Sequence, residues 1–350
     1  MSRPQISVVV PLYNKRQTVV PCLQSILAQT ERDFELIVVD DGSTDGSGEL
    51  AATLSDPRLR IVRQENRGES AARNRGIAEA RADLIAFLDA DDLWMPEFLA
   101  AVSSLARQFP EAGLFATGLG RCWLDGRPDL LVGVKSPDGK SGVLVDDYFS
   151  AVQEGDFISS SNVCIRRKVL ESCGGFLEGE PLGADIELWT RIHWTWPFAC
   201  HPEVLAWYFT PQNSVHLSRP PTAELPLVVR RQLARLAEES PAPLLAARVR
   251  NYTDWQLTRH ADRLLWNGEA GLLDRYLKDA PFFSKATARR YRLIGWTARH
   301  ISVAAAKALR WGPEKVAHAV WPSYGRRRVL DVRRRACCHV SAGISEGARA

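Results

Sequence analysis

The segment Phe87–Trp94, with the sequence FLDADDLW, constrains the fold of this chain more than any other stretch. An uninterrupted apolar run, Leu84–Leu88, ends abruptly at three carboxylates, Asp89, Asp91 and Asp92. Because strands that are buried on both faces look like continuous apolar runs, this pattern favours a parallel or mixed sheet. Ligands of open α/β sheets lie just beyond the carboxyl ends of the strands. The sequence therefore predicts a binding site at this strand end.

The three neighbouring acids also indicate a cation. Like charges this close repel one another, and a divalent metal with oxygen ligands would compensate them. Mg²⁺ and Mn²⁺ both suit carboxylate ligands, and such ions commonly bind through one or two carboxylates together with substrate phosphates. The alternative is a solvent-exposed acidic turn that precedes a helix starting near Pro96.

Strand and helix patterns alternate through the first 105 residues or so. Apolar runs predict strands over residues 6–10, 34–39, 59–62 and 84–88, and helical patterns lie between them, for example over residues 19–27. This alternation is typical of βαβ units and predicts a doubly wound sheet of Rossmann type. The chain lacks a Gly-x-Gly-x-x-Gly motif after the first strand and a Walker A lysine motif, which argues against dinucleotide and P-loop sites. Acids, not glycines, follow two strands: Asp40 and Asp41 after the second, and Asp89 after the fourth.

Four motifs occur in order at the spacing of a known family. They are VVPLYN at 9–14, VVDDGSTD at 38–45, NRG at 66–68 with ARNRG at 72–76, and LDADD at 88–92. Together they resemble the nucleotide-sugar half of a family 2 glycosyltransferase of the GT-A fold. The resemblance extends over roughly residues 5–215, and it implies an α/β GT-A domain with a mixed sheet.

The resemblance also implies roles for residues on the donor side. Asp41 matches the acid that contacts the nucleotide base, Asp89 matches the acid near the ribose, and Asp91 matches the acid that holds the metal on the diphosphate. Asp89 and Asp91 are the expected metal ligands. The full set expected to bind the nucleotide-sugar is Pro11, Tyr13, Asn14, Asp41, Arg73, Asp89, Ala90 and Asp91.

A second motif, GADIELWTRI at 183–192, resembles the segment of the family that carries the catalytic base. The family usually has Gly-Glu-Asp here, and this chain has Ala184 in place of the Glu. Asp185 matches the general base and begins a predicted helix, where the helix dipole favours a carboxylate. Trp189 lies four residues further on and is expected to form an aromatic wall on the acceptor side, together with Glu187. Glu180 and Glu187 are alternative bases.

The resemblance implies a metal-dependent, inverting enzyme. A sugar would pass from a nucleoside-diphosphate sugar to a hydroxyl of a glycan or lipid-linked acceptor, in the synthesis of a cell-surface polysaccharide or glycoconjugate. Two other classes remain open: a nucleotidyltransferase, which also uses paired acids and metal, and a relative that binds a sugar nucleotide without turnover.

Composition bounds the domain organisation and the compartment. With 350 residues the chain has room for about two domains. We place them at 1–217 and 218–350, and we divide the first near residue 110 into donor and acceptor halves.

The seven cysteines are scattered without a Cys-x-x-Cys pair, which favours a reducing compartment. No signal peptide or run of about 18 apolar residues is recognised. We expect a cytoplasmic protein, with a peripheral position on the inner face of the cell membrane as a further option.

The last third of the chain has helical patterns and is basic. Between residues 285 and 335 there are 14 Lys or Arg against two acids, and tryptophans are interleaved with them. This pattern suits the surface of an anionic membrane, and it suits equally a solvent-exposed helical cap. A nucleic-acid partner is not expected.

Overall fold

A computed structural model describes residues 3–123, 128–134, 136, 142–155, 157–180, 182–210, 222–300 and 303–311. These residues divide into two compact units. The first comprises residues 3–148 and 155–210, and the second comprises residues 149–154 and 222–311. The predicted domain boundary between 217 and 218 lies outside the described residues, as do the arginine runs at 326–328 and 333–335.

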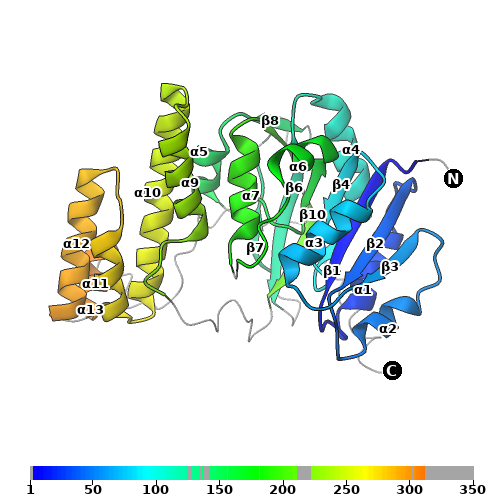
Figure 1. The fold of residues 1–350 in the computed structure, drawn as a ribbon, viewed down its shortest axis with the longest axis horizontal. Coiled ribbons are helices and arrows are strands. Elements are labelled where there is room, and N and C mark those ends of the chain that lie inside the picture. The colour runs from blue at the N-terminus through cyan, green and yellow to red at the C-terminus, as the bar shows by residue number, and fades with distance from the viewer. Residues whose placement is uncertain are drawn as a thin grey trace. The chain divides into compact units, whose positions relative to one another are not determined.

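The first unit is built on one mixed sheet of ten strands, shown in blue to green in Figure 1. Its main path runs β3-β2-β1-β4-β9-β6-β10-β5, with β7 beside β6 and β8 beside β10. The bounds are β1 Ile6–Leu12, β2 Phe34–Asp40, β3 Leu59–Arg63, β4 Leu84–Phe87, β5 Leu93–Trp94, β6 Leu114–Trp123, β7 Pro128–Val132, β8 Val143–Val145, β9 Val163–Arg166 and β10 Phe198–Thr210.

Strands β1 to β4 form the parallel half of the sheet that the apolar runs predicted. β1 pairs in parallel with β2 and β4, and β2 pairs in parallel with β3. Beyond β4 the sheet is mixed, because β9 pairs antiparallel with both β4 and β6, while β10 pairs in parallel with β6. The predicted doubly wound, mixed α/β architecture is confirmed.

Helices cover both faces of this sheet, which explains why β1 is apolar throughout. Its even residues, from Ile6 to Leu12, join a core with buried side chains of α1 and α4. On the opposite face α3 lies so close that a Cβ atom on Gly76 would come within 2.2 Å of Val9. The helices of this unit are α1 Val19–Leu27, α2 Ser47–Ala52, α3 Glu69–Glu79, α4 Phe98–Gln108, α6 Arg167–Cys173 and α7 Ala184–His193.

The second unit is helical. It includes most of α5 (Tyr148–Glu154), followed by α9 Leu227–Glu238, α10 Pro243–Trp266, α11 Ala270–Asp279, α12 Lys285–His300 and α13 Val303–Trp311. Asp254 of α10 accepts hydrogen bonds from the backbone N–H groups of Phe283 and Ser284, both at 2.7 Å, and so fixes the turn that precedes α12. None of the described helices is both long enough and apolar enough to span a bilayer.

Some boundaries differ from those that the residue pattern suggests. The pattern over residues 158–167 suggests a strand from Ile158, but β9 begins only at Val163. The apolar spacing suggests two helices that are separated between residues 257 and 264, but α10 continues to Trp266, because no Gly or Pro interrupts it before Gly268.

Candidate active site

The carboxyl ends of β1, β2 and β4 meet at one edge of the sheet. Strand order changes direction at β1, whose neighbours are β2 on one side and β4 on the other. In register, Leu12 lies beside Asp40, and Val9 lies beside Phe87. Such a switch point is where open α/β sheets bind ligands. The loops that follow these three strands carry most of the residues that the sequence singled out.

Asp41, directly after β2, is almost completely buried. Its carboxylate accepts hydrogen bonds from Gln64 Nε2 at 2.7 Å and from the backbone N–H groups of Arg67 at 3.0 Å and Gly68 at 2.9 Å. These bonds hold the loop that leads into α3. A contact between Asp41 and a nucleotide base stays a prediction.

The residues at the end of β1 and in the loop that follows differ in their exposure to solvent. Pro11 is buried within the strand, whereas the Tyr13 side chain is 47% exposed. Asn14 has a positive φ of 52°, and its side-chain oxygen accepts a hydrogen bond from the Thr44 backbone at 2.9 Å. The Asn14 bond ties the loops after β1 and β2 together and leaves Tyr13 open to a ligand.

The three acids after β4 have different environments, although they lie within four residues. Asp92 is fully buried and accepts hydrogen bonds from Ser161 Oγ and from the Phe209 backbone N–H. Burial raises the pKa of Asp92 well above its ordinary value, and the nearby Asp91 and Asp89 raise it further. Asp92 therefore ties the segment after β4 to Ser161 and to β10, and of the three acids only Asp89 and Asp91 are partly exposed.

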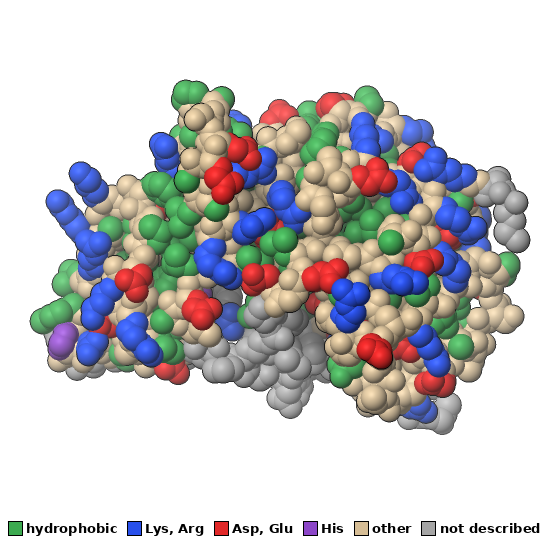
Figure 2. Space-filling model, viewed as in Figure 1, with side chains coloured by type: hydrophobic (Ala, Val, Ile, Leu, Met, Phe, Trp, Pro, Cys, Tyr) green, Lys and Arg blue, Asp and Glu red, His purple; other side chains and the backbone are tan. Residues whose placement is uncertain are grey.

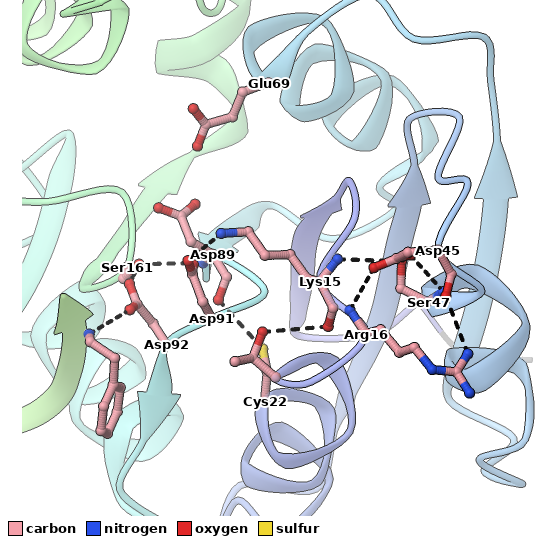
Figure 3. A network of polar contacts seen from close by, with 12 residues as sticks. Lys15, Arg16, Cys22, Asp45, Ser47, Glu69, Asp89, Asp91, Asp92 and Ser161 are labelled. Carbon is pink, nitrogen blue, oxygen red and sulfur yellow. Dashed lines mark hydrogen bonds and ion pairs between the residues drawn. The ribbon is translucent and has the colours of Figure 1, made fainter. Parts of the chain in front are cut away.

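A lysine that the sequence did not single out balances this cluster. Lys15, in the loop after β1, forms an ion pair with Asp91, and Figure 3 shows its side chain reaching toward the acids. Burial acts to lower the pKa of Lys15, but the charges of Asp91, Asp89 and Asp92 outweigh it and raise the pKa. Lys15 therefore stays charged and offsets one acid of the cluster.

Arg73 of α3 balances the other exposed acid. Its guanidinium is buried and bonds to Asp89 at 2.7 Å and to Glu69, which lies one helical turn earlier. Burial acts to lower the pKa of Arg73, but Asp89, Glu69 and Asp185 outweigh it and raise the pKa. The resemblance predicted an arginine near the nucleotide and the acids, and Arg73 does lie among carboxylates from both halves of the domain. A contact between Arg73 and the nucleotide stays a prediction.

Asp185 lies in the first turn of α7, after Gly183, whose φ of 79° ends the preceding loop. Burial raises the pKa of Asp185, and Arg73 and the Ile186 backbone N–H partly offset this effect. The charge of Asp89 also acts on Asp185. The proposed base and the donor-side acids therefore belong to one electrostatic site.

Two acceptor-side predictions were wrong. Trp189 has no exposed surface and packs edge-on against Phe176, with ring centroids 6.0 Å apart. Glu187 is 2% exposed and pairs with Arg191, which also donates to the Gly175 carbonyl at 2.8 Å. Neither side chain can face a sugar in this structure, and Glu187 cannot serve as an alternative base. The Ala90 side chain is likewise buried in the core, so only its backbone is left for a ligand.

Sequence reasoning missed Lys15, Glu69 and Ser161. Glu69 had a signal, because an acid four residues before Arg73 on a helix is a typical ion pair. Lys15 and Ser161 had none, because their partners lie 76 and 69 residues away in the chain.

The carboxylates of Asp89 and Asp91 suit a hard divalent cation, although they do not enclose it. Arg73 bonds to Oδ1 of Asp89, and Lys15 bonds to Oδ2 of Asp91, so each carboxylate keeps a second oxygen. Among the described residues, no group of three or more ligating side chains forms a metal site. Asp89 and Asp91 therefore fit a Mg²⁺ or Mn²⁺ ion that completes its coordination with substrate phosphates and water.

Comparison with known proteins agrees with this arrangement. A family model described as "Glycosyl transferase family 2" matches residues 7–123. The glycosyltransferase GlyG of Streptococcus pneumoniae is 48% identical over 91 residues, which are 25% of this chain and 30% of that protein. The matched part is therefore less than a third of that relative's length.

Solved structures share the fold over nearly the whole chain. Residues 1–349 of Staphylococcus aureus TarS, in complex with UDP-GlcNAc, align with a TM-score of 0.63 at 17% identity, covering 93% of this chain and 95% of that one. A mannosyltransferase from Pyrobaculum calidifontis, in complex with GDP-Man and Mn²⁺, aligns with a TM-score of 0.53 at 21% identity, covering 99% and 86%. At these identities the likeness confirms the GT-A fold. Over residues 7–123, this chain is similar to the proteins of glycosyl transferase family 2.

Proposed function

We propose that this chain transfers a sugar from a nucleoside-diphosphate sugar to a hydroxyl group, with inversion at the anomeric carbon. The observation that carries the proposal is that Asp185 shares Arg73 with the acids after β4. A base from the acceptor half and acids from the donor half thus lie around one buried cation, as a direct transfer between two substrates requires.

The donor would lie along the carboxyl ends of β1, β2 and β4. Tyr13, which is exposed, and Asp41 with its ordered loop flank the place proposed for the base, and Asp89 is proposed to bind the ribose. Asp89 and Asp91 would hold Mg²⁺ or Mn²⁺, and when bound the ion offsets the charge of the diphosphate. Each carboxylate would use the oxygen that its bond to Lys15 or Arg73 leaves free.

The chemical step is a single displacement. The acceptor oxygen forms a bond to the anomeric carbon while the bond to the diphosphate breaks, and the electron pair leaves with the nucleoside diphosphate. Asp185 takes the proton of the attacking hydroxyl as general base. The raised pKa of Asp185 suits this task, because a base with a higher pKa holds the proton better.

The acceptor and the place of action are part of the same proposal. We propose a glycan or lipid-linked acceptor, in cell-surface polysaccharide or glycoconjugate synthesis, at the cytoplasmic face of the membrane. The nucleotides named in the two structural neighbours, UDP-GlcNAc and GDP-Man, define the donor classes to test first.

A substitution at Asp185 tests the assignment of the base. Asp185→Asn should lower release of nucleoside diphosphate by about 10²–10⁴-fold, the usual contribution of general-base catalysis. Donor binding, measured by calorimetry, should be unchanged because the amide keeps the size of the carboxyl group. Glu171→Gln, at an exposed site on α6, is the matched control and should leave turnover unchanged.

Two outcomes would contradict this assignment. If Glu180→Gln abolishes turnover while Asp185→Asn keeps it, the base is Glu180. If the wild-type protein releases pyrophosphate instead of nucleoside diphosphate, the chain is a nucleotidyltransferase.

A further inference from the structure

Helix α12 has a basic and apolar outer face that no described part of the chain covers. Its buried residues are Ala288, Tyr291, Ile294, Gly295, Thr297 and Ala298. Its exposed residues lie on the other side at helical spacing: Lys285, Ala286, Arg289, Arg290, Arg292, Leu293, Trp296, Arg299 and His300. We call the surface of Lys285, Arg289, Arg292, Leu293 and Trp296 the α12 face.

Two large apolar side chains lie in the middle of this face. Leu293 is 55% exposed and Trp296 is 53% exposed, although both occur in a helix that has a buried side available. Leu309 of α13 is 51% exposed. Single exposed apolar residues are ordinary, but adjacent ones within a cationic surface indicate a partner that takes up apolar groups.

The charged side chains of α12 and α13 other than His are all basic. From Lys285 to Trp311 the sequence contains seven Lys or Arg and no Asp or Glu. Asp274 pairs with Arg299, and Asp262 pairs with Arg310. By contrast, no salt bridge involves Lys285, Arg289 or Arg292 within the described part of the chain. Figure 2 shows Lys and Arg side chains projecting beside apolar ones in the region where Figure 1 draws α12.

We propose that the α12 face docks on an anionic lipid surface. Arginine and lysine bind acidic headgroups, while Trp and Leu enter the boundary between headgroups and acyl chains, where Trp is favoured. A second copy of the chain would bring two cationic faces together, and residues 312–350 are themselves basic. Nucleic acid would use the arginines but not the exposed Leu293.

The inference rests on the proposed function only in that a lipid-linked acceptor would lie at such a surface. Vesicle binding needs neither donor nor acceptor, and donor hydrolysis needs no vesicle. Failure of one therefore does not imply failure of the other.

The experiment is sedimentation of the full-length protein with phosphatidylcholine vesicles that contain 0% or 30% phosphatidylglycerol. The wild-type protein should bind only the anionic vesicles. Arg289→Gln with Arg292→Gln should weaken binding about 25-fold, because each basic residue near the surface contributes about fivefold. Leu293→Ser with Trp296→Ser should weaken binding about tenfold through lost apolar burial.

The matched control is Arg230→Gln with Arg231→Gln on α9, which changes the net charge by the same amount in the same unit. It should bind like the wild type, and all variants should hydrolyse donor in solution at the wild-type rate. The proposal is wrong if the wild type ignores anionic vesicles, if the α12 variants bind as well as the control, or if the protein binds duplex DNA but no vesicles.

Discussion

Asp92 shows how much the role of a residue depends on its surroundings. It lies one residue from Asp91, yet its carboxyl group is buried and bonded to Ser161 and to the Phe209 backbone. Asp91 and Asp89, in contrast, each have a cationic partner. The two partly exposed acids can bind a cation, whereas the neighbouring charges raise the pKa of the buried acid.

This arrangement predicts a pH-dependent stability. The pKa of Asp92 is higher in the folded than in the unfolded protein, so above the ordinary Asp pKa the native state binds more protons. Its contribution to stability therefore falls as the pH rises, until the native group ionises as well. Asp92→Asn removes this titration. As the pH rises, the unfolding free energy of the variant should therefore increase relative to that of the wild type, by up to about 1.4 kcal/mol per pH unit.

Urea unfolding at pH 4.5 and 6.5 in EDTA measures this difference. Asp92→Ala is the control, since it removes the same titration but also both hydrogen bonds, and it should be less stable than Asp92→Asn at each pH. A difference between wild type and Asp92→Asn that does not vary with pH would show that burial does not shift this group.

At the residue scale, sequence predicted which acids lie at the strand ends but not what they contact. The residues Asp89, Asp91 and Asp41 stand where the motifs place them, because strand ends are local features. Lys15 and Ser161 reach them only through the tertiary fold. Arg73 was expected near the nucleotide and the acids, but its burial among three carboxylates depends on the packing of α3, which a single motif does not define.

At the scale of elements, α7 shows a different limit. Helical spacing correctly puts Asp185, Trp189 and Ile192 on one side of the helix, but spacing does not tell which side faces the core. In the structure Trp189 and Ile192 are fully buried, whereas Asp185, in the first turn, is half-buried. The helix therefore presents the base through its N-terminus and not through an aromatic face.

The turn before α7 should therefore matter for both stability and activity. Gly183 has a φ of 79°, and no atom lies within 4 Å of the position of an added Cβ. Gly183→Ala thus tests backbone strain alone and should cost about 1 kcal/mol. Thermal unfolding should shift down by about 2–4 °C, and turnover should fall because Asp185 follows two residues later.

Gly271→Ala on α11 is the matched control. It also meets no neighbouring atom, but its backbone is helical, so the change should be neutral or slightly stabilising. Equal melting temperatures for both variants would contradict the role given to the left-handed conformation at Gly183.

Strand β10 explains why the second half of the sheet was harder to predict. The apolar pattern suggests a strand only over residues 207–209, whereas β10 runs from Phe198 to Thr210. His201, Pro202 and Glu203 interrupt the apolar pattern, and the pairing with β6 shifts register between His201 and Val204. A bulge of this kind is stabilised by long-range pairing and leaves little trace in local periodicity.

At the scale of the whole molecule, the first unit contains the evidence for catalysis and the second contains the evidence for a lipid-binding surface. The match to glycosyl transferase family 2 covers residues 7–123 in the first unit, and the proposed catalytic residues all lie in this unit. The second unit contributes the basic α12 face. Its helices were predictable from periodicity, but the exposure of Leu293 and Trp296 followed only from the packing of α12.

The central claim is that the acidic strand ends bind a sugar nucleotide for transfer. Its most direct test is release of nucleoside diphosphate from a panel of UDP-, GDP- and dTDP-linked sugars, with Mn²⁺, with Mg²⁺ or with EDTA. We expect slow hydrolysis of one donor class that needs metal and is lost in Asp91→Asn. If no donor binds or is hydrolysed under any of these conditions, the assignment of this site to a nucleotide-sugar is wrong.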